Sequence, residues 1–176
     1  MTDFVLRPWK IEDASSLARF ADNPRIAANL RDAFPSPYTR GDAVEFISSC
    51  IAREGKRQLT RAIEICGEAA GSAGVFAGSD VYSRSAELGY WLAEDYWRQG
   101  VMTRAVRQIC REAFRALDIV RIFAEPFESN AGSRAVLEKA GFTCEGTMRS
   151  GVYKNGLVQS YCMYSLLRAE AEAMPL

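Results

Sequence analysis

The part of the chain best suited to chemistry is residues 87–105, where an apolar run leads through Gly100 directly into a long amphipathic stretch. This pattern predicts a strand, a turn and a helix. A helix N-terminus carries unpaired N–H groups and a partial positive charge, so it favours a phosphate group. Gly100 has no Cβ and would let a pyrophosphate approach the backbone. The segment therefore predicts a phosphate-binding turn, with a plain connecting turn as the alternative.

The types of residue that the chain lacks limit its chemistry as much as those it has. It contains no histidine. This excludes catalytic serine and cysteine triads that depend on histidine, and it excludes most types of zinc site. The cysteines are odd in number, widely spaced and set among apolar residues: Cys50, Cys66, Cys110, Cys144 and Cys162. That pattern predicts buried thiols in a reducing compartment. We expect neither a disulfide framework nor a bound metal.

The elements that must position these residues alternate between short apolar runs and amphipathic stretches. Strands are expected at residues 4–7, 59–66, 72–77, 87–92, 119–124, 142–153 and 157–166. Helices are expected to open at Glu12 or Asp13, after the N-cap Thr39, at Val101, and after Ser129-Asn130, the last one ending at Gly141. Ser, Thr and Asn favour N-caps, and glycine suits the left-handed position at a helix end.

Two further signals fix the arrangement of these elements. The run at residues 119–124 is nearly continuously apolar, which predicts a strand buried on both faces. Asn155-Gly156 lies between the last two expected strands and is a strong signal for a two-residue hairpin. The order of elements predicts an α/β fold with a mixed, mostly antiparallel central sheet flanked by helices. One parallel crossover is expected near the centre of that sheet.

Length and charge narrow the class of protein. A chain of 176 residues is expected to form one domain, here residues 1–176. It carries 22 basic and 22 acidic residues, without the basic excess that nucleic-acid binding proteins usually show. No signal-peptide pattern opens the sequence, and no apolar run reaches the length of a membrane span. We expect a cytoplasmic protein that binds neither nucleic acid nor membranes.

Two ordered motifs resemble those of the GNAT N-acetyltransferase superfamily. The first is Tyr96-Trp97-Arg98-Gln99-Gly100-Val101-Met102-Thr103-Arg104-Ala105, which is similar to the acetyl-CoA loop; the second, residues 130–142, is similar to the element Asn-x-x-Ser-x-x-x-Leu-Glu-Lys-x-Gly-Phe. Residues 6–14 and the loop 35–39 resemble the branch that contains the ribosomal-protein alanine N-acetyltransferases. The resemblance spans residues 4 to 167 and implies a GNAT-like fold.

The resemblance also implies which residues hold acetyl-CoA, the expected cosubstrate. The pyrophosphate would be cradled by backbone N–H groups of Arg98, Gln99, Gly100, Met102 and Thr103. Asn130 would meet the CoA arm or act only as a helix cap, and Arg134 would approach a CoA phosphate or remain a solvated charge. The chain departs from the family pattern at Trp97 and Met102, where Gln or Arg and Gly or Ala are usual. Met102 would either crowd the cofactor or point into the core.

By the same resemblance, the reaction is direct attack of a primary amine on the thioester, without an acyl-enzyme. The N–H of Leu92 matches the position that stabilises the oxyanion, an effect worth about 3 kcal/mol. The amine must lose a proton, which at pH 7 costs about 1.4 kcal/mol for an α-amino group and about 4.6 kcal/mol for lysine. A modest base therefore suffices for a protein N-terminus. Glu87 is the candidate base, with a surface carboxylate as the alternative.

The departing thiolate requires a proton donor. Many superfamily members use a tyrosine seven residues after the motif asparagine, but Leu137 stands there. In the branch that the chain most resembles, Ser133 is the corresponding donor, although it could equally serve as a residue of the first helical turn. The amine pocket is expected to draw on aromatic side chains, some of which would instead belong to the core: Phe34, Tyr38, Tyr90 and Trp91.

Three functions remain open at this stage. The first is an N-acetyltransferase that acts on a protein or peptide N-terminal α-amine. The second is an N-acetyltransferase that acts on a small-molecule amine, since the branch includes enzymes of both kinds. The third is a non-catalytic CoA-binding sensor or scaffold, which Met102 and the missing tyrosine motivate. A homodimer is possible, as it is common among similar proteins.

Overall fold

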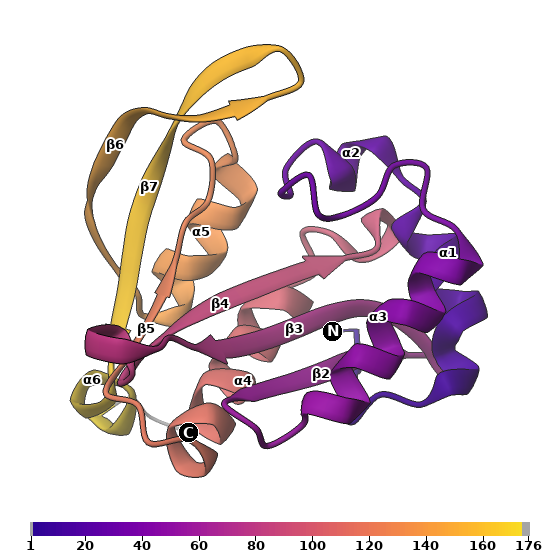
Figure 1. Ribbon diagram of the computed structural model, residues 1–176, viewed down its shortest axis with the longest axis horizontal. Helices are drawn as coiled ribbons and strands as arrows, with labels where there is room; N and C mark the ends of the chain where they lie inside the picture. Colours follow the sequence, from indigo (N-terminus) through magenta and orange to yellow (C-terminus); the bar gives the residue numbers. More distant parts are fainter. Residues whose placement is uncertain (1, 174–176) are drawn as a thin grey trace.

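The computed structural model describes residues 2–173, which form one seven-stranded sheet with helices on both faces (Figure 1). The strand order is β1-β2-β3-β4-β5-β7-β6. The strands are β1 (Val5–Arg7), β2 (Gln58–Ile65), β3 (Glu68–Ala77), β4 (Ser85–Leu92), β5 (Arg121–Ala124), β6 (Thr143–Lys154) and β7 (Leu157–Leu167). Only β4 and β5 pair in parallel, so the mixed, mostly antiparallel sheet with a central parallel pair is confirmed.

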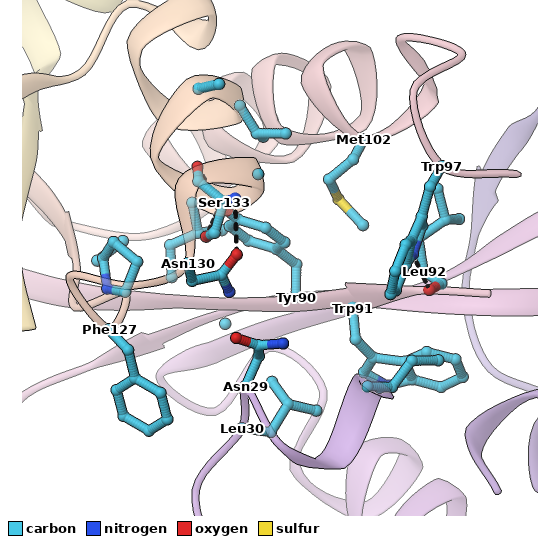
Figure 2. Close-up of a pocket in the computed structure, with 18 of the residues that line it drawn as sticks. Asn29, Leu30, Tyr90, Trp91, Leu92, Trp97, Met102, Phe127, Asn130 and Ser133 are labelled. Carbon is cyan, nitrogen blue, oxygen red and sulfur yellow. Dashed lines mark hydrogen bonds between the residues drawn. The ribbon is translucent and has the colours of Figure 1, made fainter. Parts of the chain in front are cut away.

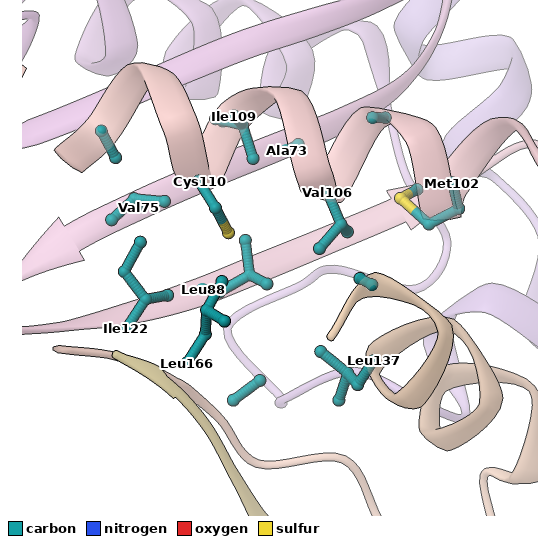
Figure 3. Packing of buried hydrophobic residues seen from close by; sticks show 14 of the residues in the cluster. Ala73, Val75, Leu88, Met102, Val106, Ile109, Cys110, Ile122, Leu137 and Leu166 are labelled. Atoms are coloured by element: carbon teal, nitrogen blue, oxygen red, sulfur yellow. The ribbon is translucent and has the colours of Figure 1, made fainter. Parts of the chain in front are cut away.

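The helices divide between the two faces of the sheet. They are α1 (Ala14–Ala21), α2 (Pro24–Ala27), α3 (Arg40–Arg53), α4 (Val101–Ala116), α5 (Ala131–Ala140) and α6 (Arg168–Ala173). One apolar cluster joins α1 and α3 to the sheet, and a larger one joins α4 and α5 to it. Figure 3 shows the larger cluster, in which Val106 and Ile109 of α4 face Val75 of β3 and Leu88 of β4. We call these two sides of the sheet the α3 face and the α4 face.

Local sequence signals account for most element ends. The Thr39 side chain accepts a hydrogen bond from the Asp42 amide at the start of α3, and Asn130 caps α5 in the same way through the Ser133 amide. Gly141 ends α5 in the left-handed conformation, with φ of 99°. Asn155 and Gly156 both have positive φ, as a primed hairpin turn requires. The predicted caps and hairpin are therefore confirmed.

Several expectations were wrong in detail. Strand β5 covers only residues 121–124 and its burial alternates, so it is not buried on both faces. Its half-buried positions are Arg121 and Phe123, and the Arg121 guanidinium forms an ion pair with Glu145 at 2.5 Å. Cys66 and Cys144 are exposed, whereas the other three thiols are buried. The short helix α6 was not expected, and β3 begins four residues before the expected Ser72.

The feature of the fold that matters for function is the separation of β4 from β5. Their parallel register extends only from Ser85 opposite Arg121 to Glu87 opposite Phe123. Beyond that point β4 continues to Leu92, still paired with β3 on its other edge, while β5 ends at Ala124. The edge of β4 that faces β5 therefore loses its partner strand, and an opening forms through the sheet.

The described part of the chain contains no helix long and apolar enough to cross a membrane. Within residues 2–173 there is also no group of three or more His, Cys, Asp or Glu side chains placed to hold a metal ion.

Candidate active site

A cleft of about 1320 Å³ occupies the opening between β4 and β5. Its lining comes from both faces of the sheet (Figure 2): Met102 of α4, with Asn130 and Ser133 at the start of α5, lies on one side of β4, and Asn29 and Leu30, which follow α2, lie on the other. The cleft thus passes through the sheet rather than resting on one face of it.

The alternation of side chains along β4 assigns each of its residues to one side of this passage. Successive residues of a strand point to opposite faces. Leu88, Tyr90 and Leu92 pack with the cluster beneath α4, whereas Trp91 packs with the cluster of the α3 face. Glu87 has the same parity as Trp91 and so belongs to the α3 face. The candidate base therefore lies on the opposite face from α4 and α5.

The start of α4 opens onto the cleft with its amide groups. Gly100 caps the helix with φ of 72°, and the first bond to the preceding turn runs from the Arg104 amide to the Gly100 carbonyl. The amides of residues 101–103 thus have no partner within the helix. A Cβ built on Gly100 would meet nothing within 4 Å. The helix start is therefore open on the side from which an anion would approach.

The Trp97 side chain fixes the loop before α4 to strand β4. Its indole Nε1 donates to the Leu92 carbonyl at 2.8 Å, and the Arg25 guanidinium stands over its ring at 5.4 Å. Met102, the other departure from the family pattern, is only 8% exposed and packs in the apolar cluster beneath α4 while still lining the cleft. Both unusual residues thus belong to the wall of an open cleft.

The backbone N–H of Leu92 faces the same opening. The Ala93 amide donates to the Ala70 carbonyl of β3 at 2.8 Å, so the peptide groups of Leu92 point to the opposite edge of β4. Consistent with this, the Leu92 carbonyl accepts from Trp97 rather than from a strand. Since β5 no longer runs alongside at this point, the Leu92 N–H is available to a ligand in the cleft.

Two hydroxyl groups meet on the α4 face. The Tyr90 Oη lies 2.7 Å from the Ser133 Oγ and 3.2 Å from the Ser133 carbonyl oxygen. The Ser133 amide donates to Asn130 Oδ1 at 3.0 Å, which fixes the serine in the first turn of α5. Burial raises the pKa of Tyr90 despite its bond to Ser133, so this phenol stays protonated. Ser133 is therefore a hydroxyl held in place by a partly buried tyrosine.

Glu87 has two charged neighbours at the point where the strands separate. Its carboxylate pairs with the Arg31 guanidinium at 2.5 Å, and the same guanidinium pairs with Glu125 at 2.9 Å. Burial raises the pKa of Glu87, the Glu125 charge raises it further, and Arg31 opposes both effects; the net direction is upward. A carboxylate of this kind is a stronger base than an exposed glutamate.

The structure brings most of the expected site residues together in one cleft. Those that line it are Glu87, Tyr90, Trp91, Leu92, Arg98, Gln99, Gly100, Met102, Thr103, Asn130 and Ser133. Arg134 does not line it, because its side chain reaches Tyr164 Oη and the Glu128 carbonyl instead. Phe34 and Tyr38 stand behind Trp91, with ring centroids 5.9 Å (Phe34–Trp91) and 4.8 Å (Phe34–Tyr38) apart. They support the wall rather than form it.

The lining also includes residues that were not predicted from the sequence, among them Arg31, Glu125 and Tyr161. Arg31 and Glu125 are 94 positions apart in the chain, so no local spacing links them. The one available signal was the position of Glu125, directly after the apolar run that forms β5 and next to Pro126. Leu137, which stands where a tyrosine is usual, is fully buried and takes no part in the site.

Comparison with known proteins agrees with this geometry. The acetyltransferase (GNAT) domain family matches residues 3–143. A putative ribosomal N-acetyltransferase, YdaF of Bacillus subtilis (strain 168), is 40% identical over 93 residues, which are 53% of this chain and 51% of that protein. The chain thus spans about half the length of the curated relatives it matches.

Solved structures extend the likeness to almost the whole chain. RimJ of Mycobacterium smegmatis, in complex with CoA-disulfide, has a TM-score of 0.84 and 25% identity, over 95% of this chain and 83% of that one. The ribosomal L7/L12 alpha-N-protein acetyltransferase RimL, in complex with coenzyme A, shares the fold with a TM-score of 0.81 at 22% identity, over 95% of each chain.

The family match covers most of the chain, and the passage between β4 and β5 contains residues of both motifs as well as the candidate base. The chain belongs to the GNAT acetyltransferase family.

Proposed function

We propose that the protein is an acetyl-CoA-dependent N-acetyltransferase that acetylates a primary amine, most favourably a protein or peptide N-terminal α-amine. The observation that carries this proposal is the passage through the sheet. It connects a helix start suited to an anion, on the α4 face, with a half-buried, ion-paired carboxylate on the α3 face. Two substrates that enter from opposite faces can therefore meet beside the unpaired edge of β4.

The residues on the α4 face fit acetyl-CoA. The open amides at the start of α4, the space above Gly100 and the cations Arg98 and Arg104 suit a pyrophosphate. The unpaired edge of β4 offers backbone N–H and C=O groups to the amides of the pantetheine arm. When bound, the thioester supplies the acetyl group. The N–H of Leu92 is placed to stabilise negative charge that develops on the acetyl oxygen.

Glu87 is proposed as the base that deprotonates the amine, directly or through a water molecule. The raised pKa of its carboxyl brings its basicity closer to that of an α-amino group. Such a base deprotonates an α-amine, with a pKa near 8, more easily than a lysine side chain, with a pKa near 10.4. This difference, together with relatives named as ribosomal-protein acetyltransferases, supports an N-terminal amine as the acceptor.

Ser133 is proposed as the donor that protonates the departing thiolate. It lies on the α4 face, where the cosubstrate is expected, and its hydroxyl is held by the Tyr90 phenol. Tyr90, expected from sequence in the amine pocket, is better placed as the residue that orients Ser133. Because the Tyr90 phenol stays protonated, it can donate to Ser133 while Ser133 donates onward.

The first test addresses the cosubstrate. In Gly100→Ala, a methyl group stands over the start of α4, so we expect the Kd for acetyl-CoA measured by calorimetry to rise about tenfold. Gly55→Ala is a matched control, since Gly55 also has φ of 72° and open space around its Cβ position but does not line the cleft. Both substitutions place an alanine at the same positive φ. Equal, undiminished binding by both variants would refute the phosphate site.

The second test addresses the base. Glu87→Gln should lower kcat/KM by about 10²- to 10³-fold with little change in the Kd for acetyl-CoA. The wild-type rate should fall as the pH drops through the raised pKa of Glu87, because the base is then protonated, and this acid limb should vanish in the variant. Glu128→Gln, which removes an exposed carboxylate outside the cleft, should leave the profile unchanged. Retention of full activity and of the acid limb in Glu87→Gln would exclude Glu87 as the base.

The third test addresses the two hydroxyls. Ser133→Ala should lower kcat by about tenfold, and Tyr90→Phe by a smaller factor, since the phenol acts through the serine. In the double variant the loss should equal that of Ser133→Ala alone, because residues that act as one unit are not additive. Losses that multiply in the double variant would mean that the two hydroxyls act independently.

A further inference from the structure

Arg31 spans the point where β4 and β5 separate. It lies in the loop between α2 and α3, and its guanidinium reaches across the cleft to two carboxylates. Nη2 and Nη1 bind the two oxygens of Glu87 at 2.5 and 3.2 Å, and Nη2 also binds Glu125 at 2.9 Å. Glu87 belongs to β4 and Glu125 follows β5, so one side chain connects both sides of the opening.

The next residue in the chain anchors the same loop to a third strand. Asp32 pairs at 2.7 Å with Lys154, whose side chain is only 8% exposed at the end of β6. A buried ammonium group needs such a partner, because leaving it unpaired is costly. Figure 1 shows the β6–β7 hairpin arching over towards α2. Adjacent residues thus tie the loop to β4, to the segment after β5 and to β6, which fixes Arg31 over the opening.

The charges around Glu87 show what this arrangement does. Among the residues that line the cleft, Glu87 and Glu125 are the two acidic ones. Two carboxylates at such a site, without a counter-ion, tend to share a proton. The charged groups that face Glu87 are Arg31 and Glu125, and the phenol of Tyr161 on β7 lines the same cleft. The Arg31 guanidinium is the cation that pairs with both carboxylates.

We propose that Arg31 is a positioning residue that keeps Glu87 ionised, and so able to accept a proton from the amine, while leaving room for that amine. The inference rests on the proposed function. The two bonds from Arg31 use two of about four acceptor positions on the carboxylate, so a further hydrogen-bond donor can still bind. Arg31 acts through Glu87 and contacts neither the thioester nor the transferred group.

The test compares pH profiles of kcat/KM for acetylation of a short peptide with a free N-terminal alanine. In Arg31→Gln, Glu87 and Glu125 lose their shared counter-ion, so the base should stay protonated to higher pH. We expect kcat/KM at pH 6, relative to its plateau at high pH, to fall by about three- to tenfold more than in the wild type. Arg31→Lys keeps the charge without the paired geometry and should restore part of that loss.

A matched control is Arg84→Gln. Arg84 directly precedes β4, is similarly exposed and pairs with Asp118 outside the cleft. The pH profile of Arg84→Gln should therefore coincide with that of the wild type. The proposal falls if the Arg31→Gln profile also coincides with that of the wild type. It falls equally if Arg84→Gln shifts the profile as much, or if Arg31→Lys is no better than Arg31→Gln.

A readout without turnover separates this inference from the proposed function. The ¹³C carboxyl resonance of Glu87, assigned by its loss in Glu87→Gln, should titrate at higher pH in Arg31→Gln than in the wild type. If the wild type acetylates no amine but this shift is present, the proposed function fails and the role of Arg31 in the charge state of Glu87 stands. If the resonance titrates identically in both proteins, the inference fails whatever the activity.

Discussion

The separation of β4 from β5 after Glu87 is the constraint on which the rest of the site depends. A sheet edge without a partner strand leaves backbone groups unpaired, and such groups must be satisfied by other donors and acceptors. Here the Leu92 carbonyl is satisfied by Trp97, while the neighbouring N–H remains turned towards the cleft. A second long parallel strand beside β4 would close the passage and remove the site. The shortness of β5 is therefore what leaves the cleft open beside β4.

The passage also separates charges of opposite sign. The acidic lining residues, Glu87 and Glu125, stand where the strands part, and Arg31 is bound between them. The remaining cations of the lining are Arg25, Arg98, Arg104 and Lys139. Arg98 and Arg104 flank the helix start that offers its amides to a phosphate. One end of the cleft is thus suited to a polyanion and the other to an amine that arrives as an ammonium ion.

The sequence allowed the fold to be predicted well where its signals are local. Periodicity located the strands and α4, and caps such as Thr39 and Gly141 located helix ends, because these depend on neighbouring residues. The residues of the two motifs were named from their resemblance to those of a known family, and most of them line the cleft at the starts of α4 and α5. Contacts between distant segments could not be read in this way. The approach of Arg31 to Glu125 depends on the arrangement of the whole sheet.

The central claim is that this cleft transfers an acetyl group to an α-amine, and one incubation tests it most directly. The purified protein, acetyl-CoA and a peptide that carries both a free N-terminus and an internal lysine are combined, and the product is located by fragment mass spectrometry. The account predicts one acetyl group, on the N-terminal nitrogen, with formation of free CoA. A protein that binds acetyl-CoA but leaves both amines unmodified, in this peptide and in a panel of small amines, would contradict it.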